Sequence, residues 1–172
     1  MTLPMRIAFS SDHGGADLKR ELVDRLASMD SRLTLIDLGG DGSDPLDDYP
    51  DFSLRLGRFV ADGAADRGVL ICGSGVGAAI AANKVTGVRA SVCHDTYSAG
   101  QGVTHDDMNI LCLGARVVGI ELAIACVQAF VGATFSTEPR HRRRVAKVLA
   151  IEAAHGQIDE AQLDGVTAGA AR

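Results

Sequence analysis

The sequence predicts an α/β fold: a doubly wound, Rossmann-like open parallel sheet of five strands with helices on both faces, in the strand order 2-1-3-4-5. Five short apolar runs alternate with helix-like stretches at fairly regular intervals, and polar or glycine-rich segments follow these runs. Such alternation is typical of parallel sheets, whose ligands gather beyond the carboxyl ends of the strands. With 172 residues, 47% of them hydrophobic, the chain suits one domain with a substantial core.

The strands are predicted from apolar runs of the length that a buried strand needs, at residues 7–9, 33–36, 69–71, 88–92 and 110–113. Helices are predicted at residues 16–28, 51–62, 77–85, 97–103, 120–131 and 139–154. In the first helix, leucine and valine recur at helical spacing, which predicts a packed face. Four chemically rich segments follow strands and should face one crevice, at residues 10–15, 39–50, 72–77 and 93–95.

We place the domain at residues 1–155 and a C-terminal tail at 156–172. Beyond Gly156 the chain becomes small and polar with little periodicity, so we expect the tail to be flexible. The segment 39–50 is rich in glycine and aspartate and contains Pro45 and Pro50, which predicts a loop that is either mobile or covers a substrate.

Composition restricts the classes of partner. The net charge of -5 gives no basic footprint for nucleic acid or for an anionic membrane, so a small molecule is the expected partner. The longest apolar stretch without charge, 122–137, is shorter than the ~20 residues of a membrane span. No signal-like start is present and the four cysteines form no CxxC pair, so we expect a cytoplasmic, reduced protein without a disulfide or a metal.

The most informative segment is a cysteine followed by a glycine-rich turn. Cys72 ends an apolar strand, the turn runs through Gly73, Ser74, Gly75, Val76 and Gly77, and an alanine-rich helix follows. Glycines free the backbone to turn its amides toward a ligand, and the start of a helix favours an anion or an enolate-like oxygen. The same field is expected to lower the pKa of Cys72.

Three other interpretations of this segment remain open. Gly73, Gly75 and Ala78 also satisfy a dinucleotide-binding GxGxxG/A pattern, with Asp95 as a ribose acid, but such a turn normally follows the first strand. The glycines can serve only the turn, and Cys72 can be a buried hydrophobe, which is the usual fate of a free cysteine. A Walker P-loop is excluded, because no lysine followed by serine or threonine has the required spacing.

Three groups of polar residues lie outside the glycine turn. Asp12 and His13 follow the first strand, where the aspartate is a helix cap or, with the histidine, part of a phosphate or proton-transfer site. His105 lies in a polar run at 104–109, either as an incidental loop residue or as a proton-transfer group. Arg140 and Arg144 belong to the one dense basic cluster and share a helix face, so they either grip a phosphate or are merely solvated.

Taken together, these motifs resemble the type B ribose-5-phosphate isomerases, within the wider family that includes the galactose-6-phosphate isomerase subunits. The resemblance covers roughly residues 5 to 150. The motifs that carry it, in order along the chain, are 11–14, 48–50, 71–77, 81–84, 105–109, 114–116 and 140–144.

The resemblance implies an aldose-ketose isomerase that interconverts ribose 5-phosphate and ribulose 5-phosphate through an enediolate, without metal or organic cofactor. It implies Cys72 as the base between C1 and C2, where another branch uses a glutamate at the position of Ala78. The turn amides and Ser74 would hold the enediolate oxygens, and His105, aided by Asp12, would open the furanose ring. It also implies a dimer or tetramer whose sites combine two chains.

The resemblance further implies phosphate ligands and a substrate-site arginine. His13, Arg140 and Arg144 match the phosphate ligands, Arg116 matches another substrate-site arginine, and Tyr49 is expected to bind the substrate as well. One departure is Asp106, where many members carry asparagine; an aspartate cannot donate through an amide and adds negative charge near a phosphorylated substrate. The substrate therefore stays open between a pentose phosphate, a tetrose phosphate, and allose or galactose 6-phosphate.

Overall fold

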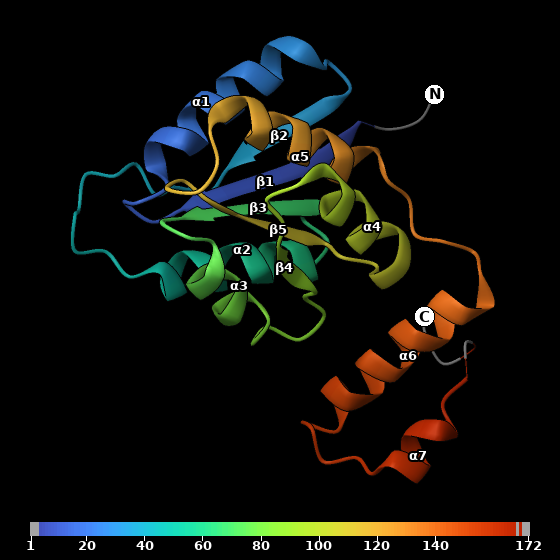
Figure 1. The fold of residues 1–172 in the computed structure, drawn as a ribbon. Helices are drawn as coiled ribbons and strands as arrows, with labels where there is room; N and C mark the ends of the chain where they lie inside the picture. Colours follow the sequence, from blue (N-terminus) through green and yellow to red (C-terminus); the bar gives the residue numbers. More distant parts are fainter. Residues whose placement is uncertain (1–3, 168, 170–172) are drawn as a thin grey trace.

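The computed structural model describes residues 4–167 and 169, and its centre is a parallel sheet of five strands (Figure 1). Parallel pairing joins each strand to its neighbours throughout. The strands are β1 (Met5–Ser11), β2 (Leu33–Asp37), β3 (Arg67–Cys72), β4 (Ala90–Val92) and β5 (Ile110–Gly114). The predicted fold class is confirmed.

The predicted strand order was wrong in one detail, because the sheet runs β2-β1-β3-β5-β4. Every residue of β5 is buried, whereas β4 has three residues and none of them is fully buried. An all-apolar strand gains most from neighbours on both sides, and a short, partly solvated strand suits a sheet edge. The last two strands therefore exchange places relative to chain order.

Helices cover both faces of the sheet, and alternate strand residues enter opposite cores. On one face α1 (Ala16–Met29), α4 (Thr96–Asp106) and α5 (Ile120–Gly132) pack against side chains such as Phe9 and Leu111. On the other, α2 (Tyr49–Ala61) and α3 (Val76–Ala82) pack against Ala8, Leu70 and Cys112. The carboxyl ends of β1, β3 and β5 therefore lie side by side at one end of the sheet.

The last two helices extend from this body as an arm (Figure 1). α6 (Pro139–Ala153) buries His141, Val145 and Ala146 and contacts α4, while α7 (Glu160–Asp164) folds back on it through a Lys147–Asp164 ion pair of 2.9 Å. The described part of the predicted tail thus contains one short helix, and positions 168 and 170–172 lie outside the described residues. The flexibility of this tail stays a prediction.

In the part of the chain that the structure describes, no helix combines the length and the apolar character needed to cross a membrane.

Candidate active site

The glycine turn after β3 folds back on the cysteine that precedes it. Gly75 adopts a left-handed conformation with φ of 82°, and its N–H donates to the Cys72 Sγ at 3.0 Å. The Val76 N–H donates to the Ser74 hydroxyl at 3.3 Å as α3 begins. Within the described residues, the amides of Gly73 and Ser74 have no acceptor. The turn, called the anion cradle below (residues 73–77), thus offers two open donors beside a sulfur.

Cys72 differs from the three other cysteines in what surrounds its sulfur. Burial raises the pKa of the Cys93 thiol, raises that of Cys126 to about 11 and raises that of Cys112 further still. These three therefore behave as packed apolar side chains. The Cys72 sulfur is also buried, but it accepts the amide that would stabilise a thiolate.

Asp12 and His13 sit at the end of β1, next to the anion cradle. Asp12 Oδ1 accepts the Gly15 N–H at 3.1 Å, and a Cβ on Gly14 would lie 3.3 Å from both this oxygen and the Gly73 nitrogen. Burial is the main cause that raises the pKa of Asp12. The aspartate therefore closes the turn that leads into α1 and borders the cradle, but it does not cap the helix, whose N-cap is Gly15 without a side-chain cap.

The His13 ring is held by Asp47, a residue that the sequence did not single out. Their Nδ1 and Oδ1 atoms lie 2.6 Å apart, and the same oxygen accepts the His13 N–H at 3.0 Å. This hydrogen bond is the main cause that raises the pKa of His13. The raised pKa favours the imidazolium form, and a positive charge next to the cradle suits an anionic ligand.

Two further predicted residues close over the cradle. A Cβ on Gly77 would lie 2.9 Å from the Tyr49 ring, so the ring rests directly on the turn. The backbone N–H of Arg116 donates to the Gly73 carbonyl at 3.0 Å, and the side-chain Nε of Arg116 lies 3.6 Å from where a Gly73 Cβ would be. The cradle is thus bordered by an aromatic ring and a guanidinium.

His105 belongs to a second group of side chains on α4 and α6. The sequence placed it in a polar loop, but the structure places it in the last turn of α4. Its ring stacks on that of His141 with centroids 4.0 Å apart, and its Nδ1 lies 2.9 Å from the Gln101 Nε2. If the amide donates there, a neutral His105 carries its proton on Nε2.

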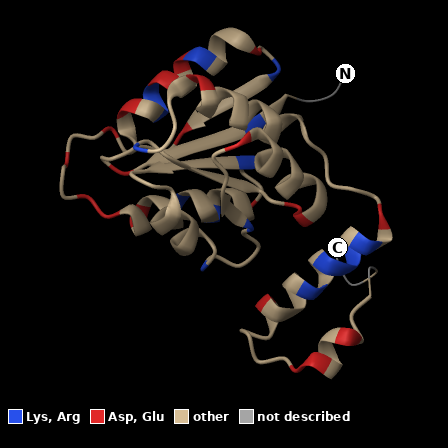
Figure 2. Cartoon of the chain, in the orientation of Figure 1, with Lys and Arg blue, Asp and Glu red and all other residues tan. Residues whose placement is uncertain are grey.

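Arg140 and Arg144 lie beside this histidine pair and are exposed on α6, which carries most of the arm's positive charge (Figure 2). His141 is buried and its Nδ1 has no hydrogen-bond partner among the described residues. Burial, then His105 and the two arginines, lowers the pKa of His141. A neutral imidazole thus supports the stacked ring of His105.

Topology places the anion cradle and the His105 group at opposite ends of the strands. Cys72 ends β3, whereas α4 runs back across the sheet and His105 lies just before β5 begins. Six residues of strand span roughly 16 Å, so the two side chains of one chain lie too far apart to act on one sugar carbon chain. A site that uses both residues needs a second copy of the chain.

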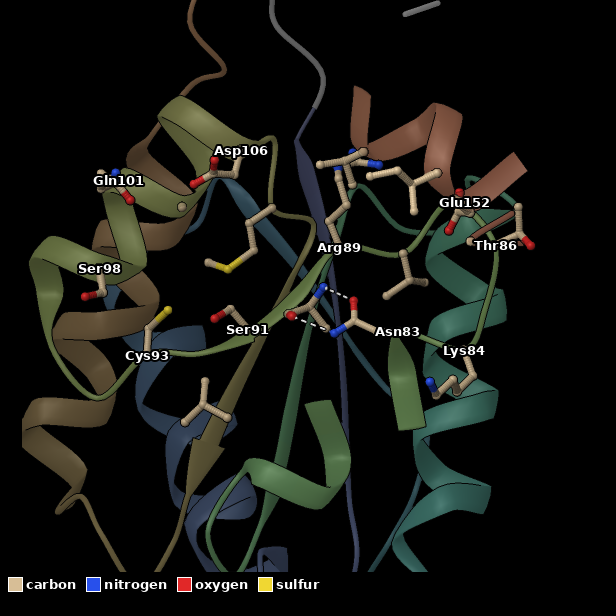
Figure 3. Close-up of a pocket in the computed structure, with 18 of the residues that line it drawn as sticks. Asn83, Lys84, Thr86, Arg89, Ser91, Cys93, Ser98, Gln101, Asp106 and Glu152 are labelled. Carbon is tan, nitrogen blue, oxygen red and sulfur yellow. Dashed lines mark hydrogen bonds between the residues drawn. The ribbon is translucent and has the colours of Figure 1, made fainter. Parts of the chain in front are cut away.

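A cavity of about 960 Å³ lies between β4, α4 and the arm (Figure 3). Of the predicted site residues it contains only Asp106, which is exposed there. Its wall includes Asn83, whose side chain pairs with the backbone of Ala90 at 2.8 and 2.9 Å. The cavity is therefore distinct from the anion cradle of the same chain.

The described residues contain no group of three or more histidine, cysteine, aspartate or glutamate side chains that could hold a metal ion.

A family model described as Ribose/Galactose Isomerase matches residues 7–148. The chain belongs to this family. Ribose-5-phosphate isomerase B of Escherichia coli (strain K12) is 45% identical over 147 residues, which cover 86% of this chain and 96% of that protein. D-erythrulose-4-phosphate isomerase 2 of Mycolicibacterium smegmatis is 38% identical and covers 88% of this chain and 100% of its own length.

A solved member of the family is also similar in three dimensions. The crystal structure of ribose-5-phosphate isomerase B from Mycoplasma genitalium with bound ribulose-5-phosphate has a TM-score of 0.81 and 37% sequence identity, covering 88% of this chain and 99% of its own. The prediction of an isomerase-family enzyme is thereby confirmed, and the dinucleotide-binding alternative loses its support.

Proposed function

We propose that this chain interconverts D-ribose 5-phosphate and D-ribulose 5-phosphate through an enediolate. The observation that carries the proposal is the Cys72 sulfur held against the Gly75 amide beside the open amides of Gly73 and Ser74. A base and oxyanion donors are what an aldose-ketose isomerisation requires. The names of the E. coli relative and of the M. genitalium complex support the choice of a pentose 5-phosphate.

In the proposed reaction the Cys72 thiolate takes the proton from C2 of the open-chain aldose. The electron pair of that bond forms the C1–C2 double bond, and the C1 carbonyl oxygen becomes an oxyanion held by the cradle amides. The thiol then returns the proton to C1, while the C2 hydroxyl becomes the carbonyl and its proton passes to O1. Each well-placed amide donor is worth about 3 kcal/mol in such a transition state.

Ring opening and phosphate binding are assigned to the remaining residues. His105, with Asp12, moves the proton between the anomeric hydroxyl and the ring oxygen. His13, whose pKa Asp47 raises, contacts the phosphate together with Arg140 and Arg144. Arg116 and Tyr49, which border the cradle, contact the sugar.

The active unit in this proposal is a homodimer, or a tetramer built from such dimers. Because Cys72 and His105 of one chain lie at opposite ends of the strands, the cradle of one copy receives His105 and Asp106 from its partner. Arg140 and Arg144 accompany them, since α6 packs against α4. No metal and no organic cofactor takes part.

A tetrose phosphate is the second candidate substrate, because the M. smegmatis relative is named D-erythrulose-4-phosphate isomerase 2. Asp106 does not decide between the substrates, since its negative charge would oppose a nearby phosphate on a sugar of any length. Allose 6-phosphate and galactose 6-phosphate are the six-carbon alternatives.

An activity screen separates these substrates. We expect the highest kcat/KM on ribose 5-phosphate, with erythrose 4-phosphate, allose 6-phosphate and galactose 6-phosphate assayed at the same enzyme concentration. A dominant rate on a tetrose or hexose phosphate would replace the pentose assignment. Tight NAD binding without any isomerase activity would overturn the whole proposal.

A further inference from the structure

His94 has no role in the mechanism above, yet its side chain accepts a backbone hydrogen bond from the segment that lies behind the anion cradle. It follows β4, whose pairing with β5 ends at Val92 opposite Cys112, and Cys93 then donates its N–H to the Cys112 carbonyl at 3.3 Å. Beyond that point the next hydrogen-bond acceptor for β5 is the His94 imidazole and no longer the backbone of β4. Its Nε2 accepts the N–H of the buried Gly114 at 2.9 Å.

Gly114 lies directly against the cradle. A Cβ on Gly114 would be 2.7 Å from the carbonyl carbon and oxygen of Ser74, which leaves no space between the two backbones. A Cβ on Gly75 would lie 3.1 Å from the Leu113 carbonyl carbon and 3.3 Å from the Gly114 nitrogen. The position of Gly114 therefore determines where Ser74 and Gly75 can lie.

The other hydrogen bonds of this segment run to the end of β3 and within its own turn, where the Gly114 carbonyl accepts the N–H groups of Val117 and Val118. Ala115 and Arg116 donate their N–H groups to the carbonyls of Cys72 and Gly73 at 2.9 and 3.0 Å. These bonds tie the segment to the end of β3, but they leave the Gly114 N–H pointing the other way, toward β4. His94 supplies the acceptor on that side.

We propose that His94 is a positioning residue for the anion cradle. By accepting the Gly114 amide it holds the backbone against which Ser74 and Gly75 rest, and so keeps the Gly75 N–H on the Cys72 sulfur. The kinetic part of this proposal depends on the proposed isomerase function, whereas the structural part does not.

The chemistry of the side chain fits this role. Because Nε2 accepts, a neutral His94 carries its proton on Nδ1. Capping of α4 does not require His94, since the Asp95 carboxylate already accepts the Ser98 N–H at 2.7 Å. Removal of the imidazole would leave a buried backbone N–H without an acceptor, which the local backbone can relieve only by moving.

The test compares His94→Ala with His94→Gln, whose amide oxygen can reach the position of Nε2. His155→Asn is the matched control, because His155 is exposed and its φ of 49° is one that asparagine tolerates. Two quantities are measured in the full-length protein: kcat and KM for ribose 5-phosphate, and amide hydrogen exchange of Gly75 and Gly114 by NMR.

For His94→Ala we expect kcat to fall about tenfold with KM changed less than twofold, because the cradle is loosened while its donors are all retained, which costs less than the loss of a donor. Exchange at Gly75 should accelerate at least tenfold relative to amides in the middle of α2. His94→Gln should restore both quantities to within threefold of wild type, and His155→Asn should leave them unchanged.

Three outcomes would overturn the proposal. Faster exchange at Gly114 with Gly75 unchanged means that the imidazole does not hold the cradle, and equal acceleration of all amides means a merely structural role. Failure of His94→Gln to restore Gly75 protection removes the acceptor role. If the wild-type protein has no isomerase activity, the proposed function fails, but the exchange measurement still decides the positioning claim.

Discussion

The left-handed glycine of the cradle provides a sharp test of how backbone geometry supports catalysis. We consider Gly75→Ala beside Gly63→Ala. The two glycines have φ of 82° and 73°, so an alanine at either position meets the same left-handed penalty of about 1–2 kcal/mol. Gly63 has open space where its Cβ would be, whereas a Cβ on Gly75 would sit 3.1 Å from the Leu113 carbonyl carbon.

Both variants should therefore lose stability, but only Gly75→Ala should lose activity. We expect urea denaturation to show the free energy of unfolding lowered by about 1–2 kcal/mol in Gly63→Ala and by more in Gly75→Ala, whose Cβ also meets the Leu113 backbone. Only Gly75→Ala has to shift the turn by a few tenths of an ångström, which moves the Gly75 N–H off the Cys72 sulfur. Loss of one preorganised donor predicts a fall in kcat of about 10²-fold.

The assay is the initial rate of ribulose 5-phosphate formation at saturating ribose 5-phosphate, measured beside the denaturation curves. Gly63→Ala should keep kcat within about twofold, because its turn follows α2 and lies away from the site. If Gly75→Ala lost stability but kept wild-type kcat, the reasoning that links this amide to catalysis would be refuted.

Three further predictions concern single side chains. Cys72→Ala should lower kcat by about 10³-fold while phosphate binding, measured by calorimetry, is retained; near-normal turnover would exclude this base. Arg140→Ala and Arg144→Ala should chiefly raise KM, by about tenfold each, and an unchanged KM would remove them from the phosphate site. The NMR titration of His13 should show a pKa above the ordinary 6.5, and Asp47→Asn should lower that pKa. The stability that the His13–Asp47 pair contributes is complete below the pKa of His13 in the unfolded chain. It is lost as the pH rises through the raised pKa of His13 in the folded protein.

The fold was predictable where local pattern decides, and less so where pairing decides. Apolar runs and helical spacing are local, so all five strands and the first six helices were found. The run at 88–92 looked like an ordinary strand, but only Ala90–Val92 pairs, at the edge of the sheet. Strand order depends on which apolar surfaces meet in three dimensions, and the chain order of the runs does not contain that information.

The candidate site shows the same division. Cys72 and the glycine turn are contiguous in sequence, so their geometry could be inferred from residue types alone. Asp47 was missed because its partner, His13, is 34 residues away and one of four aspartates in its loop had to be chosen. His141 was missed as a partner of His105, since their stacking depends on how α6 packs against α4.

The central claim, that one catalytic site takes Cys72 from one copy and His105 from another, is tested most directly by mixing two inactive variants. Cys72→Ala and His105→Ala, unfolded and refolded together, should regain about a quarter of wild-type kcat, because half of the dimers are mixed and each mixed dimer has one intact site. Native mass spectrometry would verify that mixed dimers form. Mixed dimers without recovered activity would contradict the shared site.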